Sequence, residues 1–284
     1  MEHKTTGTLY LCATPIGNLE DITLRALRIL KEVDCIAAED TRHTRKLLSH
    51  FDIHTPLLSY HSHSSEGKEE QLIMRLKQGE NIALVSDAGM PGISDPGADL
   101  VRLALEQEII VVPLPGASAG IAALVASGLP TNKFVFEGFL SNQRKTRRKQ
   151  LQTLKSEQRT MIFYESPHRL TDTLKDMLRE LGDRSGVVAR ELTKVHEEFK
   201  RGLLSQLLVH YDNNHPRGEV CLIVGGAAKE ELGGEVTNQW AEISLAEHIE
   251  SLLQQGYDKK EAIKQVAKLR GLPKREVYAV VHKD

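Results

Sequence analysis

The chain has 284 residues, of which 40% are hydrophobic, and its formal net charge at pH 7 is −2. This length and composition predict a globular protein of two domains with a small additional module. The near-neutral charge excludes a polycation, so any nucleic acid would have to be bound by local clusters of basic residues.

Neither the apolar runs nor the cysteines indicate a membrane or an oxidising environment. No apolar run is long enough to span a bilayer, and the first ten residues lack the hydrophobic stretch of a signal peptide. The cysteines Cys12, Cys35 and Cys221 are far apart in the chain. We therefore expect reduced, buried thiols in a cytoplasmic protein, not a disulfide framework or a zinc site.

The first part of the chain alternates strand-like and helix-like patterns. Strands are expected at residues 9–13, 35–38, 82–85 and 109–113, and helices near 22–32, 41–50, 66–78 and 97–107. Such alternation predicts βαβ units and a mainly parallel sheet. We assign residues 1–115 to this N-terminal α/β domain.

A second α/β domain is expected over residues 116–230. Its predicted helices are 117–127, 144–156 and 168–181, and its predicted strands are 134–136, 160–164, 186–190 and 219–224. The less regular alternation favours a mixed sheet. The Gly- and Glu-rich segment 225–239 reads as a linker.

Three short helices are predicted in residues 240–284. Ser244 and Glu247 have the spacing of a capping box, and Asp258 is a suitable cap for the second helix. The arrangement resembles a helix-turn-helix, but a small packing or dimerisation module fits the nearly balanced charge equally well.

The first expected strand ends in a turn that indicates a ligand site. The sequence Thr14-Pro15-Ile16-Gly17-Asn18 links this strand to a helix, an arrangement that often holds a small ligand. The chain contains neither G-x-G-x-x-G nor G-x-x-x-x-G-K-[ST]. Ordinary dinucleotides and nucleoside triphosphates are therefore not supported as ligands.

The segment "ALVSDAGMPGISDPGADLV", residues 83–101, is the richest in site features. A strand ends at Ser86 and Asp87, and glycines, prolines and Asp95 follow. Ligands of open parallel sheets bind beyond the carboxyl ends of the strands, where glycines let them approach the backbone. We expect a binding site here.

The segment 116–120 matches the G-x-S-x-G pattern of serine hydrolases and lies between a strand and a helix. His168, His196, His210 and His215 follow in the chain. The sequence lacks an upstream HGGG-type segment, and Pro113 and Pro115 interrupt the strand. The alternative is that Ser118 and the helix N-terminus bind a polar group of a ligand.

Two segments are rich in basic residues. Residues 39–48 hold Arg42, His43, Arg45 and Lys46, and residues 142–159 hold seven Lys or Arg and one acidic residue. Such clusters favour phosphate contacts, and single-stranded or looped RNA is the expected target. His61 and His63 lack a third metal ligand, and we predict no metal site.

Seven segments together are similar to the tetrapyrrole methylase superfamily. In chain order these are "ATPIGNLEDITLRAL", "AEDTRHTRKLL", "SDAGMPGISDPG", "PLPGASA", "FYESPHRL", "RELTKVHEEF" and "RGEV". Within the superfamily they resemble the bacterial enzymes that methylate a cytidine 2'-hydroxyl in 16S rRNA. The resemblance covers about residues 8–226 and the terminal helices. Met90 departs from the pattern, which has threonine there.

The resemblance implies a two-domain fold with S-adenosylmethionine in the cleft, a homodimer, and 16S rRNA in the small ribosomal subunit as substrate. The target would be a cytidine of the decoding region. The residues implied to contact the cofactor are Pro15, Asp87, Gly89, Met90, Pro91, Ile93, Ser94, Ser118, Ala119, Tyr164 and Ala189. Arg42, Arg45, Arg147 and Arg148 would contact the RNA, and no metal is needed.

A hydroxyl is a poor nucleophile, so methyl transfer to it calls for a general base. Asp40, Glu165 and Glu191 are the candidates, and the sequence does not choose among them. Two alternatives to the rRNA methyltransferase stay open. They are a superfamily relative that methylates a tetrapyrrole, and a non-enzymatic ribosome-binding factor.

Overall fold

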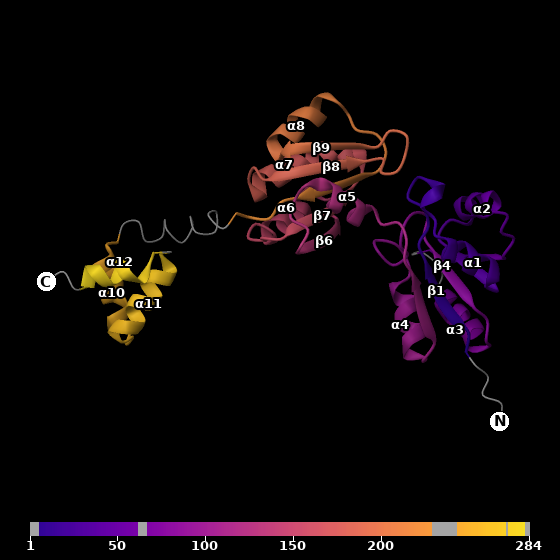
Figure 1. Ribbon diagram of the computed structural model, residues 1–284, viewed down its shortest axis with the longest axis horizontal. Helices are drawn as coiled ribbons and strands as arrows, with labels where there is room; N and C mark the ends of the chain where they lie inside the picture. The colour runs from indigo at the N-terminus through magenta and orange to yellow at the C-terminus, as the bar shows by residue number, and fades with distance from the viewer. Residues whose placement is uncertain (1–5, 62–66, 229–242, 271, 282–284) are drawn as a thin grey trace.

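The computed structural model describes residues 6–61, 67–228, 243–270 and 272–281. Two five-stranded sheets lie next to each other in the chain and in space, and a group of three helices follows at the C-terminus (Figure 1). An α/β fold with a parallel sheet, a mixed sheet and terminal helices was predicted and is confirmed.

The first sheet is parallel throughout and has the strand order β3-β2-β4-β1-β5. Its strands are β1 (Thr8–Cys12), β2 (Cys35–Ala38), β3 (Leu57–Ser59), β4 (Ile82–Val85) and β5 (Ile110–Leu114). Strand β3 was not predicted, because it has only three residues and lies at the edge of the sheet. Side chains of β2 and β4 are buried on both faces, as expected for a covered parallel sheet.

Helices cover both faces of this sheet. Helices α1 (Leu24–Glu32) and α2 (Thr41–His50) pack with Ile36, Ala38 and Val85, whereas α3 (Lys68–Lys77) and α4 (Ala98–Glu106) pack with Leu9, Ala37 and Leu84. A short 3-10 helix, η1 (Leu19–Asp21), precedes α1. Because β1 and β4 are parallel neighbours, the turn after β1 and the loop after β4 leave the sheet at the same edge, beyond the carboxyl ends of the strands.

The second sheet is mixed and has the order β6-β7-β10-β8-β9. Its strands are β6 (Phe134–Phe139), β7 (Thr160–Glu165), β8 (Ser185–Arg190), β9 (Glu198–Leu203) and β10 (Val220–Val224). Only β6 and β7 pair in parallel. Strand β9 was missed because its charged sequence, EFKRGL, reads as a polar loop.

Helix α5 (Ala119–Ser127) packs on one face of the second sheet, and α6 (Arg144–Thr153), η2 (Pro167–Arg169), α7 (Leu170–Leu181) and α8 (Leu204–Asn213) lie on the other. Helix α8 was also not predicted. Alternation along β7 sends Met161 and Phe163 to the three-helix side and Ile162 and Tyr164 to the α5 side. We propose that the two domains divide between β5 and α5.

The terminal helices α10 (Leu245–Gln254), α11 (Lys259–Leu269) and α12 (Lys274–Val281) enclose a small apolar core. The capping box is confirmed, because Ser244 Oγ accepts from Glu247 N and Glu247 Oε2 accepts from Ser244 N. Asp258 caps α11 as expected. Most of the predicted linker, residues 229–239, lies outside the described residues.

Cys12, Cys35 and Cys221 are all buried, as predicted. Burial raises the pKa of Cys12 and of Cys221 to about 12, so both are neutral thiols near pH 7. Across the described ranges, none of the helices has the length and apolar character that crossing a membrane requires.

Candidate active site

The turn after β1 is tied to the loop after β4. Thr14 N donates to Gly89 O at 2.9 Å, and Gly89 N donates to Thr14 O at 3.1 Å. Thr14 Oγ1 also donates to Ser86 O at 3.1 Å. These bonds hold the two segments that sequence analysis singled out side by side.

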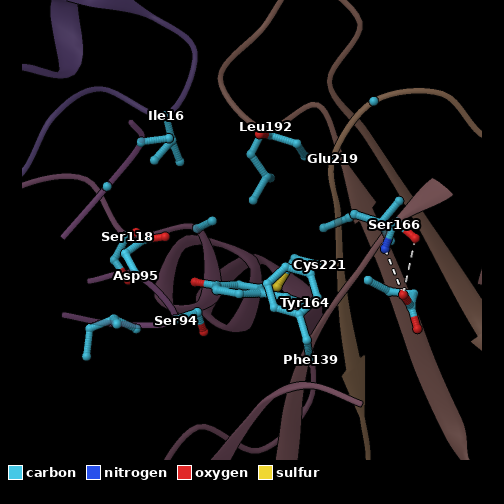
Figure 2. Close-up of a pocket in the computed structure, with 18 of the residues that line it drawn as sticks. Ile16, Ser94, Asp95, Ser118, Phe139, Tyr164, Ser166, Leu192, Glu219 and Cys221 are labelled. Atoms are coloured by element: carbon cyan, nitrogen blue, oxygen red, sulfur yellow. Dashed lines mark hydrogen bonds between the residues drawn. The ribbon is translucent and has the colours of Figure 1, made fainter. Parts of the chain in front are cut away.

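A cavity of about 430 Å³ opens between these segments and the second sheet (Figure 2). This volume is within the range of small-molecule sites, roughly 300–1,000 Å³. The lining residues come from both halves of the chain: Ile16, Asp87, Ala88, Gly89, Met90, Ile93, Ser94, Asp95, Ser118, Ala119, Phe139, Tyr164, Glu165, Ser166, Pro167, Ala189, Leu192, Gly218, Glu219, Val220 and Cys221.

The walls of the cavity are mostly apolar. Ile16 and Leu192 lie on one side and Tyr164 on the other (Figure 2), and all three belong to the apolar cluster formed by α5 and the inner face of the second sheet. Tyr164 Oη accepts a hydrogen bond from Gly120 N at 3.2 Å, which orients its ring. The cavity therefore suits a ligand with a large apolar or aromatic part.

Gly89 keeps the loop backbone bare at the cavity. Its φ is +82°, and a Cβ built there would lie 3.4 Å from Ile16 Cγ2 and 3.6 Å from Ala117 O. Such a conformation favours glycine, and the missing side chain lets a ligand approach the peptide groups.

Three carboxyl groups gather at the carboxyl ends of β2 and β4. Burial, with Asp95 and Asp87 nearby, raises the pKa of Glu39. Burial also raises the pKa of Asp95. A hydrogen bond with Ser86 acts against this shift and the charge of Asp87 adds to it, so that the pKa lies above the ordinary value. Asp87 Oδ1 accepts from Asp40 N at 3.1 Å. Of the three, Asp87 and Asp95 line the cavity.

The structure brings together most of the residues that the resemblance assigns to the cofactor. Those that line the cavity are Asp87, Gly89, Met90, Ile93, Ser94, Ser118, Ala119, Tyr164 and Ala189. Pro15 and Pro91 do not line it, and Ile16 takes the place expected for Pro15. Sequence reasoning missed Leu192 and Phe139, although the "RGEV" motif pointed to the neighbouring Gly218 and Glu219.

Of the three candidate bases, only Glu165 lines the cavity, and it is fully engaged. Thr173 Oγ1 donates to its Oε2 at 2.6 Å, and Ser166 N donates to its Oε1 at 2.8 Å. Arg169 forms an ion pair with the same Oε1 at 3.2 Å. These contacts fix the orientation of the Glu165 side chain.

Asp40 and Glu191 lie outside the cavity lining. Asp40 caps α2, and hydrogen bonds from Arg42 hold its pKa well below the usual range. Burial alone would raise the pKa of Glu191, but Lys194 and the amide of Glu219 outweigh it and lower the pKa. Both carboxyl groups thus lie outside the cavity and have lowered pKa values, which makes them weaker bases than free carboxylates.

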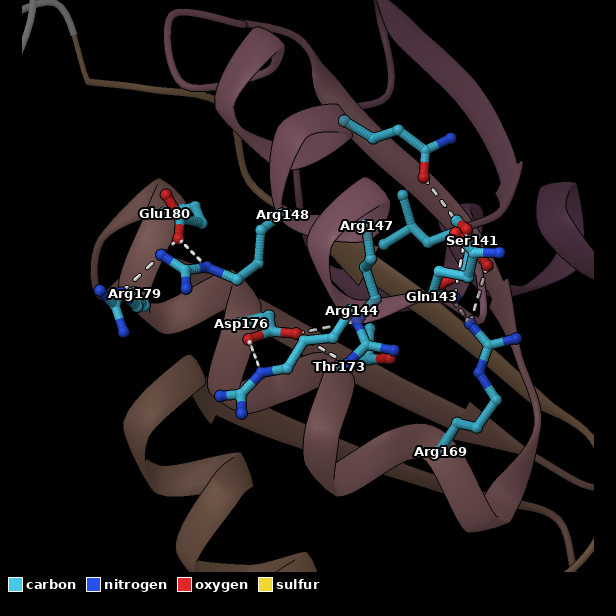
Figure 3. Close-up of polar contacts among 12 residues, drawn as sticks. Ser141, Gln143, Arg144, Arg147, Arg148, Arg169, Thr173, Asp176, Arg179 and Glu180 are labelled. Carbon is cyan, nitrogen blue, oxygen red and sulfur yellow. Dashed lines mark hydrogen bonds and ion pairs between the residues drawn. The ribbon is translucent and has the colours of Figure 1, made fainter.

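The basic residues divide into exposed and buried ones. Arg45 is exposed, and so is Arg42, although it pairs with Asp40. Arg147 was expected to contact RNA, but it is buried and pairs with the buried Asp176 at 2.7 Å (Figure 3). Arg148 is partly buried against Glu180. Sequence spacing could not show that these two arginines face the acidic residues of α7.

The hydrolase alternative lacks its catalytic partner. Ser118 lines the cavity, but the described lining residues include no histidine that could activate it. His63 lies outside the described residues. The described part of the chain holds no group of three or more His, Cys, Asp or Glu side chains arranged for a metal ion.

Residues 8–208 match the family of tetrapyrrole (corrin/porphyrin) methylases, and the chain belongs to that family. Among curated relatives, the chain is 55% identical to the ribosomal RNA small subunit methyltransferase I of Halalkalibacterium halodurans. That match covers 98% of this chain and 96% of the relative. The Bacillus subtilis protein of the same name is 51% identical, and the match covers 97% of this chain and 94% of the Bacillus subtilis protein.

Solved structures confirm the fold. A diphthine synthase superposes with a TM-score of 0.61 at 16% identity, over 77% of this chain and 90% of its own. The methyltransferase CobJ superposes with a TM-score of 0.59 at 21% sequence identity, and the match covers 78% of this chain and 95% of CobJ. Uroporphyrin-III C-methyltransferase from Thermus thermophilus, complexed with S-adenosylhomocysteine, superposes with a TM-score of 0.54 at 20% sequence identity. The match covers 77% of this chain and 97% of that enzyme.

Proposed function

We propose that this protein transfers a methyl group from S-adenosylmethionine to the 2'-hydroxyl of a cytidine in the 16S rRNA of the small ribosomal subunit. The observation that carries the proposal is the cavity between the two sheets, which combines an apolar wall, a loop without a side chain at Gly89, and carboxyl groups that include Asp87 and Asp95. Relatives 47–55% identical over nearly the whole chain are named ribosomal RNA small subunit methyltransferases.

The cavity fits the cofactor. Its volume of about 430 Å³ and the apolar side chains of Ile16, Tyr164 and Leu192 suit an adenosine moiety. The missing side chain at Gly89 lets the cofactor approach the loop closely, and Asp87 and Asp95 attract positive charge. When bound, the cofactor supplies an electrophilic methyl group on a positively charged sulfur.

Asp95 is the group best placed to remove the proton of the substrate hydroxyl. It lines the cavity, and burial together with Asp87 raises its pKa, which makes it a stronger base than a free aspartate. The preceding Ser94 has φ of +62°, a conformation that non-glycine residues rarely adopt and that is often found at functional sites. We assign to Asp95 the role for which Asp40, Glu165 and Glu191 were considered.

The chain itself contributes mainly by positioning. Residues on both sides of the cavity would position the acceptor relative to the donor, and such positioning can supply roughly 7–11 kcal/mol of barrier reduction. The apolar side chains of Ile16, Tyr164 and Leu192 would limit the access of water to the reacting groups. Exposed cations such as Arg45, Lys145 and Lys149 would bind rRNA phosphates.

Following the sequence resemblance, we propose that the protein acts as a homodimer in the cytoplasm and reads assembled subunits. Light scattering of the purified protein tests the dimer.

The function is tested with purified protein, tritiated S-adenosylmethionine and three acceptors. These are small subunits from cells lacking the gene, naked 16S rRNA and uroporphyrinogen III. Label in the particle supports the proposal. Label in the tetrapyrrole alone would support a role like that of the porphyrin methylases. Cofactor binding without transfer to any acceptor would indicate a non-enzymatic factor.

A further inference from the structure

Strand β6 contains a bulge close to the cavity. Phe136 pairs with Ile162, Gly138 pairs with Phe163, and the pairing register shifts between Phe136 and Gly138. Side chains alternate along a strand, so one extra residue moves every later side chain to the opposite face. The bulge therefore places Phe139 on the same face as Phe136, toward the cavity.

Phe139 lines the cavity but remains 56% exposed. Its ring lies beside Tyr164, with centroids 5.6 Å apart and planes tilted by 60° (Figure 2). Phe136 contacts Tyr164 edge to face at 5.1 Å. The ring is therefore supported by Tyr164 while more than half of its surface stays open.

The backbone on either side of Phe139 is fixed. Gly138 has φ of +63°, and a Cβ there would lie 3.4 Å from Ser94 Oγ, next to Asp95. On the other side, Arg169 Nη2 donates to Leu140 O at 2.7 Å and to Ser141 O at 3.2 Å. An aromatic ring held in this way binds a partner with little further loss of entropy.

Cations follow directly in the chain. Helix α6 starts at Arg144, and Lys145 and Lys149 are exposed with no ion-pair partner among the described residues. Open aromatic rings and exposed cations are both typical of proteins that bind single-stranded nucleic acid, in which bases stack on aromatic side chains and cations contact the phosphates along the strand.

We propose that Phe139 stacks on the base of the target nucleotide, an unpaired pyrimidine of the RNA, and so holds its ribose 2'-hydroxyl at the cavity near Asp95. This inference rests on the proposed function and deepens it. Phe139 is a positioning residue for the acceptor, and although it lines the cavity its main contact is with the acceptor base, not with the methyl donor.

The test compares Phe139→Leu and Phe139→Trp with the wild type, using small subunits from cells lacking the gene and tritiated S-adenosylmethionine. Stacking on one base is worth roughly 1–3 kcal/mol, so we expect kcat/KM for the particle to fall about 5- to 150-fold in Phe139→Leu. Phe139→Trp should recover to within about threefold of wild type, because it restores an aromatic surface. Because Phe139 also lines the cavity, the Kd for S-adenosylmethionine, from calorimetry, is measured for both variants and should change far less than kcat/KM in Phe139→Leu.

Phe134→Leu is the matched control, because Phe134 lies on the same strand, is 40% exposed and does not line the cavity. It should behave as wild type. An equal loss of S-adenosylmethionine affinity in Phe139→Leu would make Phe139 a wall of the cofactor site and overturn the inference. Unchanged kcat/KM would overturn it as well. If the wild type itself methylates no RNA, the proposed function fails, a result distinct from either variant outcome.

Discussion

Thr14 and Gly89 exchange two backbone hydrogen bonds, at 2.9 and 3.1 Å, and so join the first turn of the chain to the glycine-rich loop 75 residues later. Ile16 follows Thr14 by two residues and Met90 follows Gly89 directly, and both line the cavity. The pairing of Thr14 with Gly89 therefore brings the two segments to the same wall of the cavity. Two segments that look separate in the sequence form one surface.

Replacing Gly89 should disturb this surface. Gly89→Ala introduces a Cβ at φ of +82° and within 3.4 Å of Ile16, so it should cost about 1–2 kcal/mol of stability and weaken S-adenosylmethionine binding at least tenfold. Gly128→Ala is the control, since Gly128 has the same φ of +82° and open space around it. Urea unfolding and calorimetry give both quantities. Equal cofactor affinity in the two variants would contradict the assignment of the loop.

Asp95→Asn should slow methyl transfer about 100- to 10,000-fold, the usual contribution of a general base. In the wild type the rate should fall as the pH drops through the pKa of Asp95, which lies above its ordinary value of 3.8. The variant should lack this acidic limb. Asp99→Asn, on the exposed side of α4, serves as the control. Single-turnover rates across pH provide the measurement, and an acidic limb that persists in Asp95→Asn would rule out this base.

Glu39→Gln should stabilise the fold at neutral pH. The pKa of Glu39 is raised in the folded protein, so its ionised form costs stability above that pKa, and the cost disappears below the ordinary value of 4.5. The variant should therefore melt at a higher temperature than wild type at pH 7 and at about the same temperature at pH 4. Thermal unfolding at both pH values checks this. The exposed Glu250→Gln should show no change, and a destabilised Glu39→Gln would show that the carboxylate has a favourable partner.

Arg147→Ala should destabilise the protein by about 3–5 kcal/mol, because it leaves the buried Asp176 without its main partner. Chemical unfolding measures the loss. Arg45→Ala, an exposed cation, should change stability by less than about 0.5 kcal/mol. A stable Arg147→Ala with weakened RNA binding would restore Arg147 to the RNA surface.

The double variant Lys145→Ala, Lys149→Ala should lose affinity for RNA without losing stability, whereas Arg147→Ala should lose stability. Both side chains are exposed on α6, so stability should hold while affinity for the small subunit falls. The slope of log affinity against log salt should decrease by about 1 for each cation removed. Filter binding at several salt concentrations measures it. An unchanged slope would remove α6 from the RNA surface.

The elements that sequence predicted well are those whose pattern depends on local chemistry. Strands such as β2 and β4 are continuous apolar runs, and Ser244 and Asp258 mark helix starts with caps that the structure contains. Strand β9 and helix α8 were not predicted. The charged sequence of β9 gives no strand pattern, and β9 belongs to the sheet only through its pairing with β8. Local sequence carries no signal for such long-range pairing.

The sequence indicated which loops line the cavity, but it did not indicate which side chains in the site are already engaged by other residues. Glycine-rich segments after strands pointed to the Gly89 loop and Ser118. Glu165 and Arg147 looked available in the sequence, but Thr173 and Asp176, eight and 29 residues further along, engage them. Phe139 reached the cavity only through the bulge in β6, which changes the face that the strand pattern predicts. Tertiary pairing, not residue type, decided these outcomes.

The position of the transferred methyl group tests the central claim most directly. Small subunits from cells lacking the gene are labelled by the purified protein with tritiated S-adenosylmethionine, and the extracted 16S rRNA is hydrolysed in alkali. A methylated 2'-hydroxyl blocks cleavage, so we predict that the label appears in one alkali-resistant dinucleotide that begins with cytidine. Label released in mononucleotides would place the methyl group on a base and contradict ribose methylation.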